Sequence, residues 1–252
     1  KPVNTFDTTT KAGYIEFIEP ASSFLCYDKS KQKTSSFTEI QWSSLILSAE
    51  CFNRLHNHSY NNFMHKTIGC STCIEMRQFI PKNIASKIHN FGNFFICGNI
   101  LCKDFSPDMT LKEMAQGLRK FYTEMKSNGL IFDTLYSMYD GYPKNEGNEI
   151  PFGVMQTSNV GPQFIEKPIL DFWMEQRQPA MFTDFGTCLL SYGIKGKDRD
   201  DIVMRLRYSP RTIDPEHAKT LTLSTKFLVT NIPQSETVEN AMKELEKFQK
   251  ST

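Results

Sequence analysis

The sequence predicts a mixed α/β fold, in which a mixed β-sheet is covered by helices. Segments with alternating apolar residues and segments with apolar residues at helical spacing follow one another along the chain. Recognisable cap residues precede the helical segments, and no repeat or low-complexity stretch interrupts the series. Together these patterns predict about six strands and five helices, a composition typical of an open sheet with helices packed on it.

The first strand is predicted at Ala12–Ile18, and Pro20–Ser36 is a polar connection rich in Lys and Ser. A helix is then predicted at Phe37–His56. Ser36 precedes Glu39 by three residues, which is a capping-box pattern. Apolar residues occur nearly all round this helix, so we expect it to be buried on most of its surface.

The middle of the chain contains two predicted strands and two helical segments, at Thr67–Arg77, Asn93–Cys102, Leu111–Asn128 and Leu130–Asp140. The longer helix follows Thr110, which forms a second capping-box pattern with Glu113. Gly129 follows Asn128 and ends this helix.

The last third of the chain combines three predicted strands with two helices. The strands are predicted at Phe152–Ser158, Met181–Lys195 and Asp201–Tyr208, with a turn at 158–161 and a hairpin tip at 196–200. Asp214 is a predicted N-cap with Pro215 at the first helical position, and that helix runs through Val229. Ser235 is predicted to cap the final amphipathic helix.

Composition excludes several classes of protein. Lys and Arg number 29 against 28 Asp and Glu, so the chain lacks the basic surface that nucleic-acid binding requires. No apolar run approaches the roughly 18 residues that span a bilayer. The cysteine count of seven is odd, and Asn57 begins one N-glycosylation sequon. The compartment, cytoplasmic or secreted, stays open.

Four central cysteines, at 70, 73, 97 and 102, suggest a zinc-stabilised interaction module as one alternative. The spacing argues against it, because residues three apart on a strand point to opposite faces. We therefore expect buried thiols and no metal. Asp184-Phe185-Gly186 matches a triplet of protein kinases, but the other kinase motifs are missing, which excludes that chemistry.

An ordered series of motifs carries a resemblance to a known family. The motifs of this series are Glu75–Pro81, Phe91–Phe95, Thr157–Gly161 and a two-stranded ribbon that leads into Asp214–Glu216. In this order they resemble the C-terminal lobe of the coenzyme-A-dependent acyltransferase superfamily. That superfamily includes chloramphenicol acetyltransferase, BAHD and alcohol acetyltransferases, and peptide-synthetase condensation domains. The resemblance implies a chloramphenicol-acetyltransferase-like lobe at 37–252, preceded by an N-terminal strand and connection at 1–36.

The resemblance also implies where catalysis takes place. The family's general base is a histidine in a His-His-x-x-x-Asp-Gly motif of the N-terminal lobe, and this chain contains no His-x-x-x-Asp. We therefore expect no catalytic residue in this chain, a start near a lobe boundary, and a partner that is an N-terminal lobe or second chain. Acyl-CoA is the co-substrate that the resemblance implies.

Site residues follow from the same resemblance. Ser158, Asn159 and Gly161 would line the tunnel that holds the acyl thioester and a small-molecule ligand. Arg77 and Asn93 would support the lobe interface. Asp171 belongs to an incomplete counterpart of the BAHD Asp-Phe-Gly-Trp-Gly element.

Two main functions stay open at this point. The first is the C-terminal lobe of an O- or N-acyltransferase, in a two-lobed protein or heterodimer. The second is a non-catalytic binding protein that uses the same fold to hold a hydrophobic small molecule or a partner. The 20 Phe and 11 Met residues supply adaptable apolar linings for such a cavity.

Overall fold

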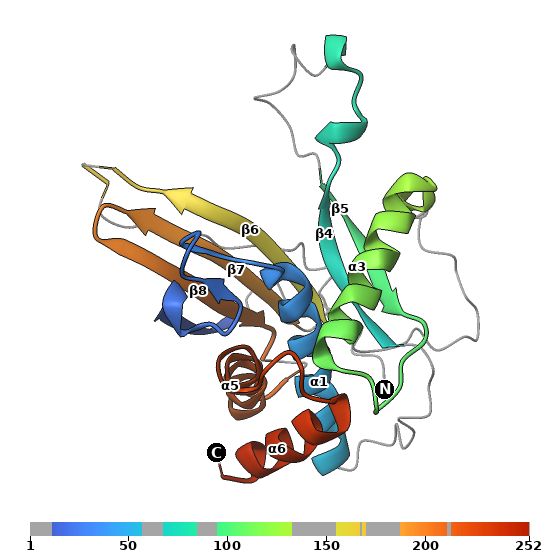
Figure 1. Ribbon diagram of the computed structural model, residues 1–252, viewed down its shortest axis with the longest axis vertical. Helices are drawn as coiled ribbons and strands as arrows, with labels where there is room; N and C mark the ends of the chain where they lie inside the picture. The colour runs from blue at the N-terminus through green and yellow to red at the C-terminus, as the bar shows by residue number, and fades with distance from the viewer. Residues whose placement is uncertain are drawn as a thin grey trace.

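The computed structural model describes residues 12–56, 68–84, 95–132, 155–166, 168–169, 187–210 and 213–251. A six-stranded mixed sheet, in the order β1-β8-β7-β6-β4-β5, forms its centre (Figure 1). The strands are β1 (Gly13–Pro20), β4 (Ile68–Glu75), β5 (Phe95–Cys102), β6 (Gln156–Phe164), β7 (Thr187–Gly196) and β8 (Arg199–Tyr208). β6 runs parallel to β4 and β7, and the other pairs are antiparallel. The predicted fold class is confirmed.

Three long helices pack against the sheet, α1 (Phe37–Leu55), α3 (Leu111–Ser127) and α5 (Pro215–Asn231), and a fourth, α6 (Val238–Ser251), packs against α1 and α5. α1 contributes to two apolar clusters. Trp42 and Leu47 pack with residues of α3, α6, β4 and β5. Leu45 packs with residues of α5, β1, β7 and β8. Burial of each such side chain contributes about 1.5–3 kcal/mol, so α1 is held from both sides, as its apolar pattern predicts.

Two helix starts have the predicted caps. Thr110 and Glu113 form a reciprocal capping box at α3, in which the Thr110 N–H donates to Glu113 Oε2 at 2.7 Å. Asp214 Oδ1 accepts a hydrogen bond from the Glu216 N–H at 2.8 Å, and Pro215 occupies the first position of α5. Both caps satisfy backbone donors that have no partner within the helix.

Two other predicted caps are wrong. Ser36 precedes α1, but it adopts a left-handed conformation (φ 56°) and its side chain makes no cap hydrogen bond. Glu39 is bound instead by Arg119 of α3. Ser235 does not cap the last helix, because α6 begins at Val238 and the Asn240 N–H donates to Thr237 Oγ1 at 3.3 Å.

The predicted turn at 158–161 is also wrong, because β6 continues through it to Phe164. The register against β7 shifts between Asn159 and Pro162, which marks a β-bulge. Gly161 takes a φ of +80° at this bulge, a conformation that side chains with a Cβ rarely adopt. Asn-x-Gly therefore bends the strand without ending it.

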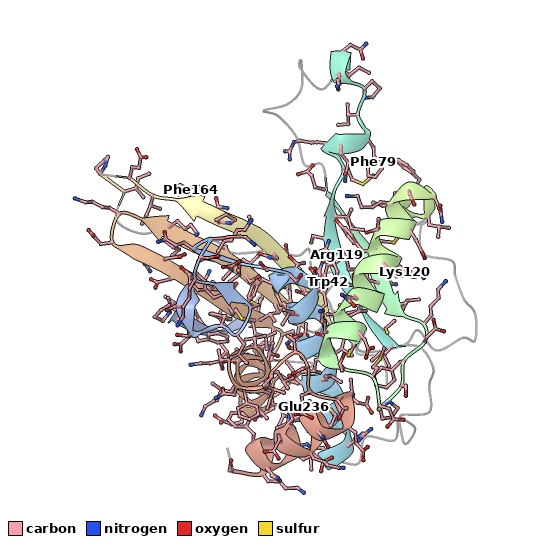
Figure 2. The ribbon with its side chains drawn as sticks, viewed as in Figure 1. Trp42, Phe79, Arg119, Lys120, Phe164 and Glu236 are labelled. Atoms are coloured by element: carbon pink, nitrogen blue, oxygen red, sulfur yellow. The ribbon has the colours of Figure 1, made fainter. Side chains whose placement is uncertain are left out.

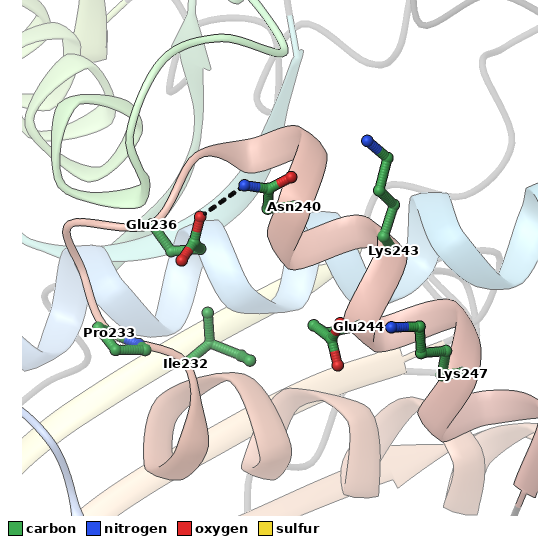
Figure 3. A pocket seen from close by; sticks show the side chains of 7 residues that line it. All are labelled: Ile232, Pro233, Glu236, Asn240, Lys243, Glu244 and Lys247. Atoms are coloured by element: carbon green, nitrogen blue, oxygen red, sulfur yellow. Dashed lines mark hydrogen bonds and ion pairs between the residues drawn. The ribbon is translucent and has the colours of Figure 1, made fainter.

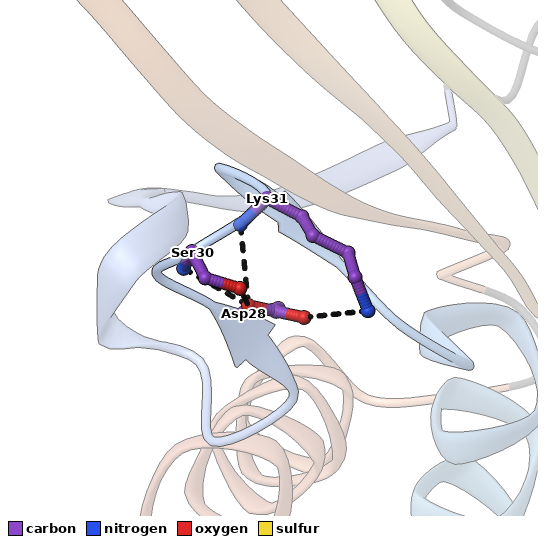
Figure 4. Close-up of polar contacts among 3 residues, drawn as sticks. All are labelled: Asp28, Ser30 and Lys31. Atoms are coloured by element: carbon purple, nitrogen blue, oxygen red, sulfur yellow. Dashed lines mark hydrogen bonds and ion pairs between the residues drawn. The ribbon is translucent and has the colours of Figure 1, made fainter.

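The connection between β1 and α1 contains more structure than its polar composition predicts. β2 (Tyr27–Asp28) and β3 (Lys33–Thr34) form a short hairpin. Asp28 Oδ1 accepts hydrogen bonds from the backbone N–H of Ser30 at 2.9 Å and of Lys31 at 3.2 Å (Figure 4). The Ser30 hydroxyl, which donates to the same oxygen at 2.6 Å, lowers the pKa of the Asp28 carboxyl most, and the Lys31 side chain and the two backbone bonds lower it further.

The N-terminal segment belongs to the same sheet as the rest of the chain, because β1 pairs with β8 along its whole length. Several predicted features lie outside the described residues. These are Asn93, Asp171, the Asn57 sequon, the Asp184–Gly186 triplet and most of the predicted helix at 130–140. No helix in the described part of the chain is long and apolar enough to cross a membrane.

Candidate functional site

The sheet separates into two parts where β4 meets β6, and the residues of the predicted tunnel lie there. β4 and β6 are paired only at Ser71 with Gln156 and Thr72 with Thr157. Beyond this β4–β6 junction, β6 follows β7 while β4 and β5 run toward α3 (Figure 1). Ser158 follows directly after the last residue of β6 that pairs with β4, so it lies where the two parts diverge.

The first turn of α1 makes hydrogen bonds to strand β6 and to helix α3. Asn159 Nδ2 of β6 donates to Thr38 Oγ1 at 2.7 Å. One residue on, Glu39 accepts a hydrogen bond from Arg119 of α3 at 2.5 Å. The Arg119 guanidinium also lies 5.0 Å from the Trp42 ring centroid, and Figure 2 shows both side chains where α1 meets α3. Consecutive residues of α1 thus fix the two sides of the junction.

A buried amide fixes α1 to the sheet one turn further along. Gln41 is fully buried, and its Nε2 donates to Thr157 Oγ1 at 2.8 Å and to the Leu189 carbonyl at 3.4 Å. Its Oε1 accepts a hydrogen bond from Ser191 Oγ at 2.6 Å. Both ends of the amide are satisfied, as burial of a polar group requires. This network positions β6 immediately before Ser158.

The structure separates Ser158 from Asn159. Side chains alternate along β6, and Thr157 and Asn159 both bind residues of α1. Ser158 therefore points to the opposite face, which we call the second face of the sheet: Gln156, Ser158, Cys188, Leu190, Arg205 and Arg207. Ser158 is partly exposed, and its hydroxyl makes no hydrogen bond to another described residue. Of the predicted tunnel residues, Ser158 has the chemistry and the orientation to contact a ligand.

Asn159 and Gly161 form a structural unit instead. The Gly161 N–H donates to Asn159 Oδ1 at 3.0 Å, while the amide nitrogen of Asn159 is used by Thr38. No heavy atom lies within 4 Å of the position that a Gly161 Cβ would take. The positive φ of the backbone explains why position 161 is a glycine. A close approach by another described residue does not explain it.

Arg77 lies at the far end of β4, in the short 3-10 helix Arg77–Phe79. Its Nη1 lies 2.6 Å from Glu75 Oε2, and its backbone N–H donates to Glu75 Oε1 at 2.9 Å. The strand was predicted to end at Arg77, whereas β4 ends two residues earlier, at Glu75. The role of Arg77 at a lobe interface stays a prediction.

The cysteines of β4 point in opposite directions. Cys70 packs in an apolar cluster with Ile74, whereas Cys73 accepts a hydrogen bond from Gln156 Nε2 at 3.5 Å on the other face. Burial raises the pKa of the Cys70 thiol far above its ordinary value, and it raises that of Cys51 to about 12. Among the described residues, no three His, Cys, Asp or Glu side chains are grouped to hold a metal ion.

A surface cleft of about 490 Å³ lies at the connection between α5 and α6. Ile232, Pro233 and Glu236 line one part of it, and polar and charged side chains of α6 line the other (Figure 3). The Asn240 amide donates to Glu236 at 2.9 Å, and Lys247 pairs with Glu244 at 2.6 Å. Its charges neutralise one another and its lining includes no residue of β6 or α1, so it contributes nothing to the candidate site.

Comparison with solved structures identifies the fold. The complex of the X-domain and OxyB from teicoplanin biosynthesis matches 95% of this chain and 46% of the other, with a TM-score of 0.55 and 13% identity. The condensation domain of the polyketide synthase MokA matches 90% of this chain and 49% of the other (TM-score 0.52, 10% identity). The epimerization domain of tyrocidine synthetase B matches 94% and 49% (TM-score 0.51, 7% identity).

No family model and no curated protein sequence matches the chain. The fold is nevertheless that of a condensation-domain lobe, which has the chloramphenicol-acetyltransferase-like architecture. The chain spans about half the length of the structures that it matches.

Sequence reasoning missed the residues that build the junction. Thr38 and Gln41 lie in a helix that was predicted only as buried. Arg119 lies in a helix that was predicted from the spacing of its apolar residues. A buried polar residue such as Gln41 among apolar neighbours is the one signal that the sequence offers. The partners of these residues lie 80 or more positions away, so the sequence alone does not identify them.

Proposed function

We propose that this chain is the C-terminal lobe of an acyl-transfer protein of the condensation type, working with an N-terminal lobe or second chain that carries the catalytic histidine. The observation that carries the proposal is the match of nearly the whole chain to about half of condensation-type domains. The absence of any His-x-x-x-Asp motif agrees with it, since the base would lie in the other lobe.

In this mechanism the histidine of the other lobe removes a proton from an alcohol or amine. The freed nucleophile attacks the carbonyl of an acyl thioester, for which acyl-CoA is our candidate, and a tetrahedral oxyanion forms. Ser158, or a backbone N–H near it, donates a hydrogen bond to that oxyanion. The C–S bond then breaks, the thiolate leaves, and the histidine returns its proton to the leaving group.

Two experiments test the proposal. Native mass measurement should find this chain joined to, or associated with, a lobe that bears His-x-x-x-Asp. The assembled protein should then transfer a labelled acyl group from a thioester, and Ser158→Ala should lower the rate about 100–1,000-fold. Ser127→Ala is the matched control, because Ser127 bonds only locally at the end of α3. Transfer at an unchanged rate in Ser158→Ala would remove Ser158 from the mechanism.

The second candidate is a non-catalytic lobe that holds a hydrophobic small molecule or a partner protein. A specific observation favours it: one of the similar structures is an X-domain in complex with another protein, OxyB. Under this alternative the assembled protein binds a defined ligand or partner but transfers no acyl group. Measured acyl transfer by the complete assembly would exclude it.

A further inference from the structure

Two arginines of β8 share the second face of the sheet, and only one of them has an acidic partner among the described residues. Arg205 and Arg207 are two residues apart on the strand, so their side chains point to the same face. Glu16 of β1 lies opposite Arg205 and forms an ion pair with it. Tyr14 lies opposite Arg207, so the neighbouring strand offers it no carboxylate.

Arg207 has no ion pair within the part of the chain that the structure describes. Its Nε is buried and makes no hydrogen bond. Burial of a charged donor without an acceptor is unfavourable, and native proteins normally provide a protein group, water or ligand at such a place. Arg205, its neighbour on the same face, shows how the sheet satisfies an arginine when only stability is required.

The described residues opposite Arg207 on the two neighbouring strands, Tyr14 and Cys188, carry no negative charge. Cys188 lies opposite it on β7, and Gln156 lies beside Cys188 on β6. Burial raises the pKa of the Cys188 thiol, so this group stays neutral, although the positive charge of Arg207 acts in the opposite sense. Ser158 is the next residue of β6 on this face. This end of the second face thus combines Arg207, which has no ion pair among the described residues, with the neutral hydrogen-bonding groups of Cys188, Gln156 and Ser158.

We propose that the second face of the sheet binds an oxyanion, a carboxylate or phosphate group of the substrate, with Arg207 as its principal ligand. A guanidinium presents parallel N–H donors that match the two oxygens of such a group. Glu16 is engaged by Arg205 and does not compete for Arg207. The assignment of the anion to the substrate rests on the proposed function, because Ser158, which that function places at the reacting carbonyl, lies on the same face as Arg207.

The test uses the whole ¹⁵N-labelled chain and two probes, inorganic phosphate and acetate, added at constant ionic strength. The side-chain Nε–H signal of Arg207 is assigned by its loss in Arg207→Gln. We expect it to shift saturably with one of the probes. The Arg207 variants lack this signal, so their binding is measured from the backbone N–H signals of β7 and β8 that shift in the wild type, and Arg207→Gln should weaken binding about tenfold or more. A response to phosphate indicates a phosphate-bearing substrate, and a response to acetate indicates a carboxylate. Either response supports the site.

Controls separate the site from general charge effects. Arg199→Gln removes an arginine that pairs with Asp201 at 2.6 Å near the hairpin tip, and its affinity should equal that of the wild type. Arg207→Lys keeps the charge but loses the paired donors, so its binding should be weaker by several fold. If Arg207→Gln does not fold, Arg207→Lys decides the test.

Two results overturn the proposal: no saturable shift with either probe, or unchanged affinity in the Arg207 variants. Such a result leaves acyl transfer untouched, because the proposed function is measured with the assembled protein and a labelled thioester. Conversely, saturable binding by an assembly that transfers no acyl group defeats the proposed function alone.

Discussion

Asn159 of β6 and Thr38 of α1 share a hydrogen bond of 2.7 Å at the point where the sheet divides. The Asn159 side chain is used at both ends, because its Oδ1 accepts the Gly161 N–H at 3.0 Å. One side chain therefore fixes the bulge of β6 and joins it to the first turn of α1. Asn159 therefore has a structural role, and its place in a tunnel stays a prediction.

Replacing Asn159 by Ala should lower the free energy of unfolding by about 1–2 kcal/mol, because two hydrogen bonds in a partly buried place are lost. Urea unfolding measures the change. Thr38→Val removes only the hydrogen bond between Asn159 and Thr38 and should lower the free energy of unfolding by about 1 kcal/mol. Thr38→Ser keeps the hydroxyl that accepts this bond and should cost less. If the effects of Thr38→Val and Asn159→Ala are additive in the double variant, the bond contributes nothing.

Gln41→Leu should be more destabilising, by about 2–4 kcal/mol, since it leaves the buried hydroxyls of Thr157 and Ser191 without their partner. Equilibrium unfolding in urea is again the measurement. Ser43→Ala is a suitable control because the Ser43 hydroxyl bonds within its own helix, to the Ile40 carbonyl at 3.0 Å. A loss in Gln41→Leu no larger than in this control would show that the network is dispensable.

Two segments that match the same capping pattern show what the sequence could and could not predict. Thr110–Glu113 and Ser36–Glu39 both match the capping box, yet only the first forms one. Glu39 is taken by Arg119, 80 residues away, and the stronger charge-assisted bond prevails. Local chemistry therefore predicts where α1 begins, while the use of its first turn depends on a contact between distant residues.

The candidate site was predictable to a similar extent. The series of motifs located β6 and its Ser158, and the fold class followed from periodicity. The separation of Ser158 from Asn159 was missed, because Asn-x-Gly is common both in turns and in bulges, and only a continuing strand puts them on opposite faces. Arg207 was visible as an alternating residue of β8. Its lack of an acidic partner among the described residues depends on the register with β1, which the sequence does not reveal.

The capping box of α3 should make stability depend on pH. Hydrogen bonds from Thr110, the backbone N–H first and the hydroxyl second, lower the pKa of Glu113 in the folded protein. A carboxyl with a depressed folded pKa stabilises the fold above its unfolded pKa of about 4.3, and this contribution is lost as the pH falls through the folded value.

The difference in unfolding free energy between the wild type and Glu113→Gln should thus be constant near pH 7. It should shrink toward zero as the pH falls from about 5 to 3. Gln keeps the shape of the side chain and can still cap, so the comparison isolates the charge. A difference that is independent of pH would contradict the depressed pKa.

Two thiols, the buried Cys51 and the half-buried Cys26, should react slowly with maleimide. Burial raises the pKa of Cys51 to about 12 and that of Cys26 to about 11. At pH 8 the reactive thiolate is then roughly one part in ten thousand for Cys51 and one in a thousand for Cys26. Mass spectrometry of peptides after timed labelling should find Cys51 modified about ten times more slowly than Cys26, and both fast in urea.

The pH dependence separates the two causes of protection. If the raised pKa governs reactivity, the labelling rate of Cys51 in the folded protein should rise about tenfold for each pH unit between 7 and 9. If access governs it, labelling requires local opening, and the rate should follow added urea as well. Labelling of Cys51 as fast as in the unfolded chain would contradict its burial in the core beside α6.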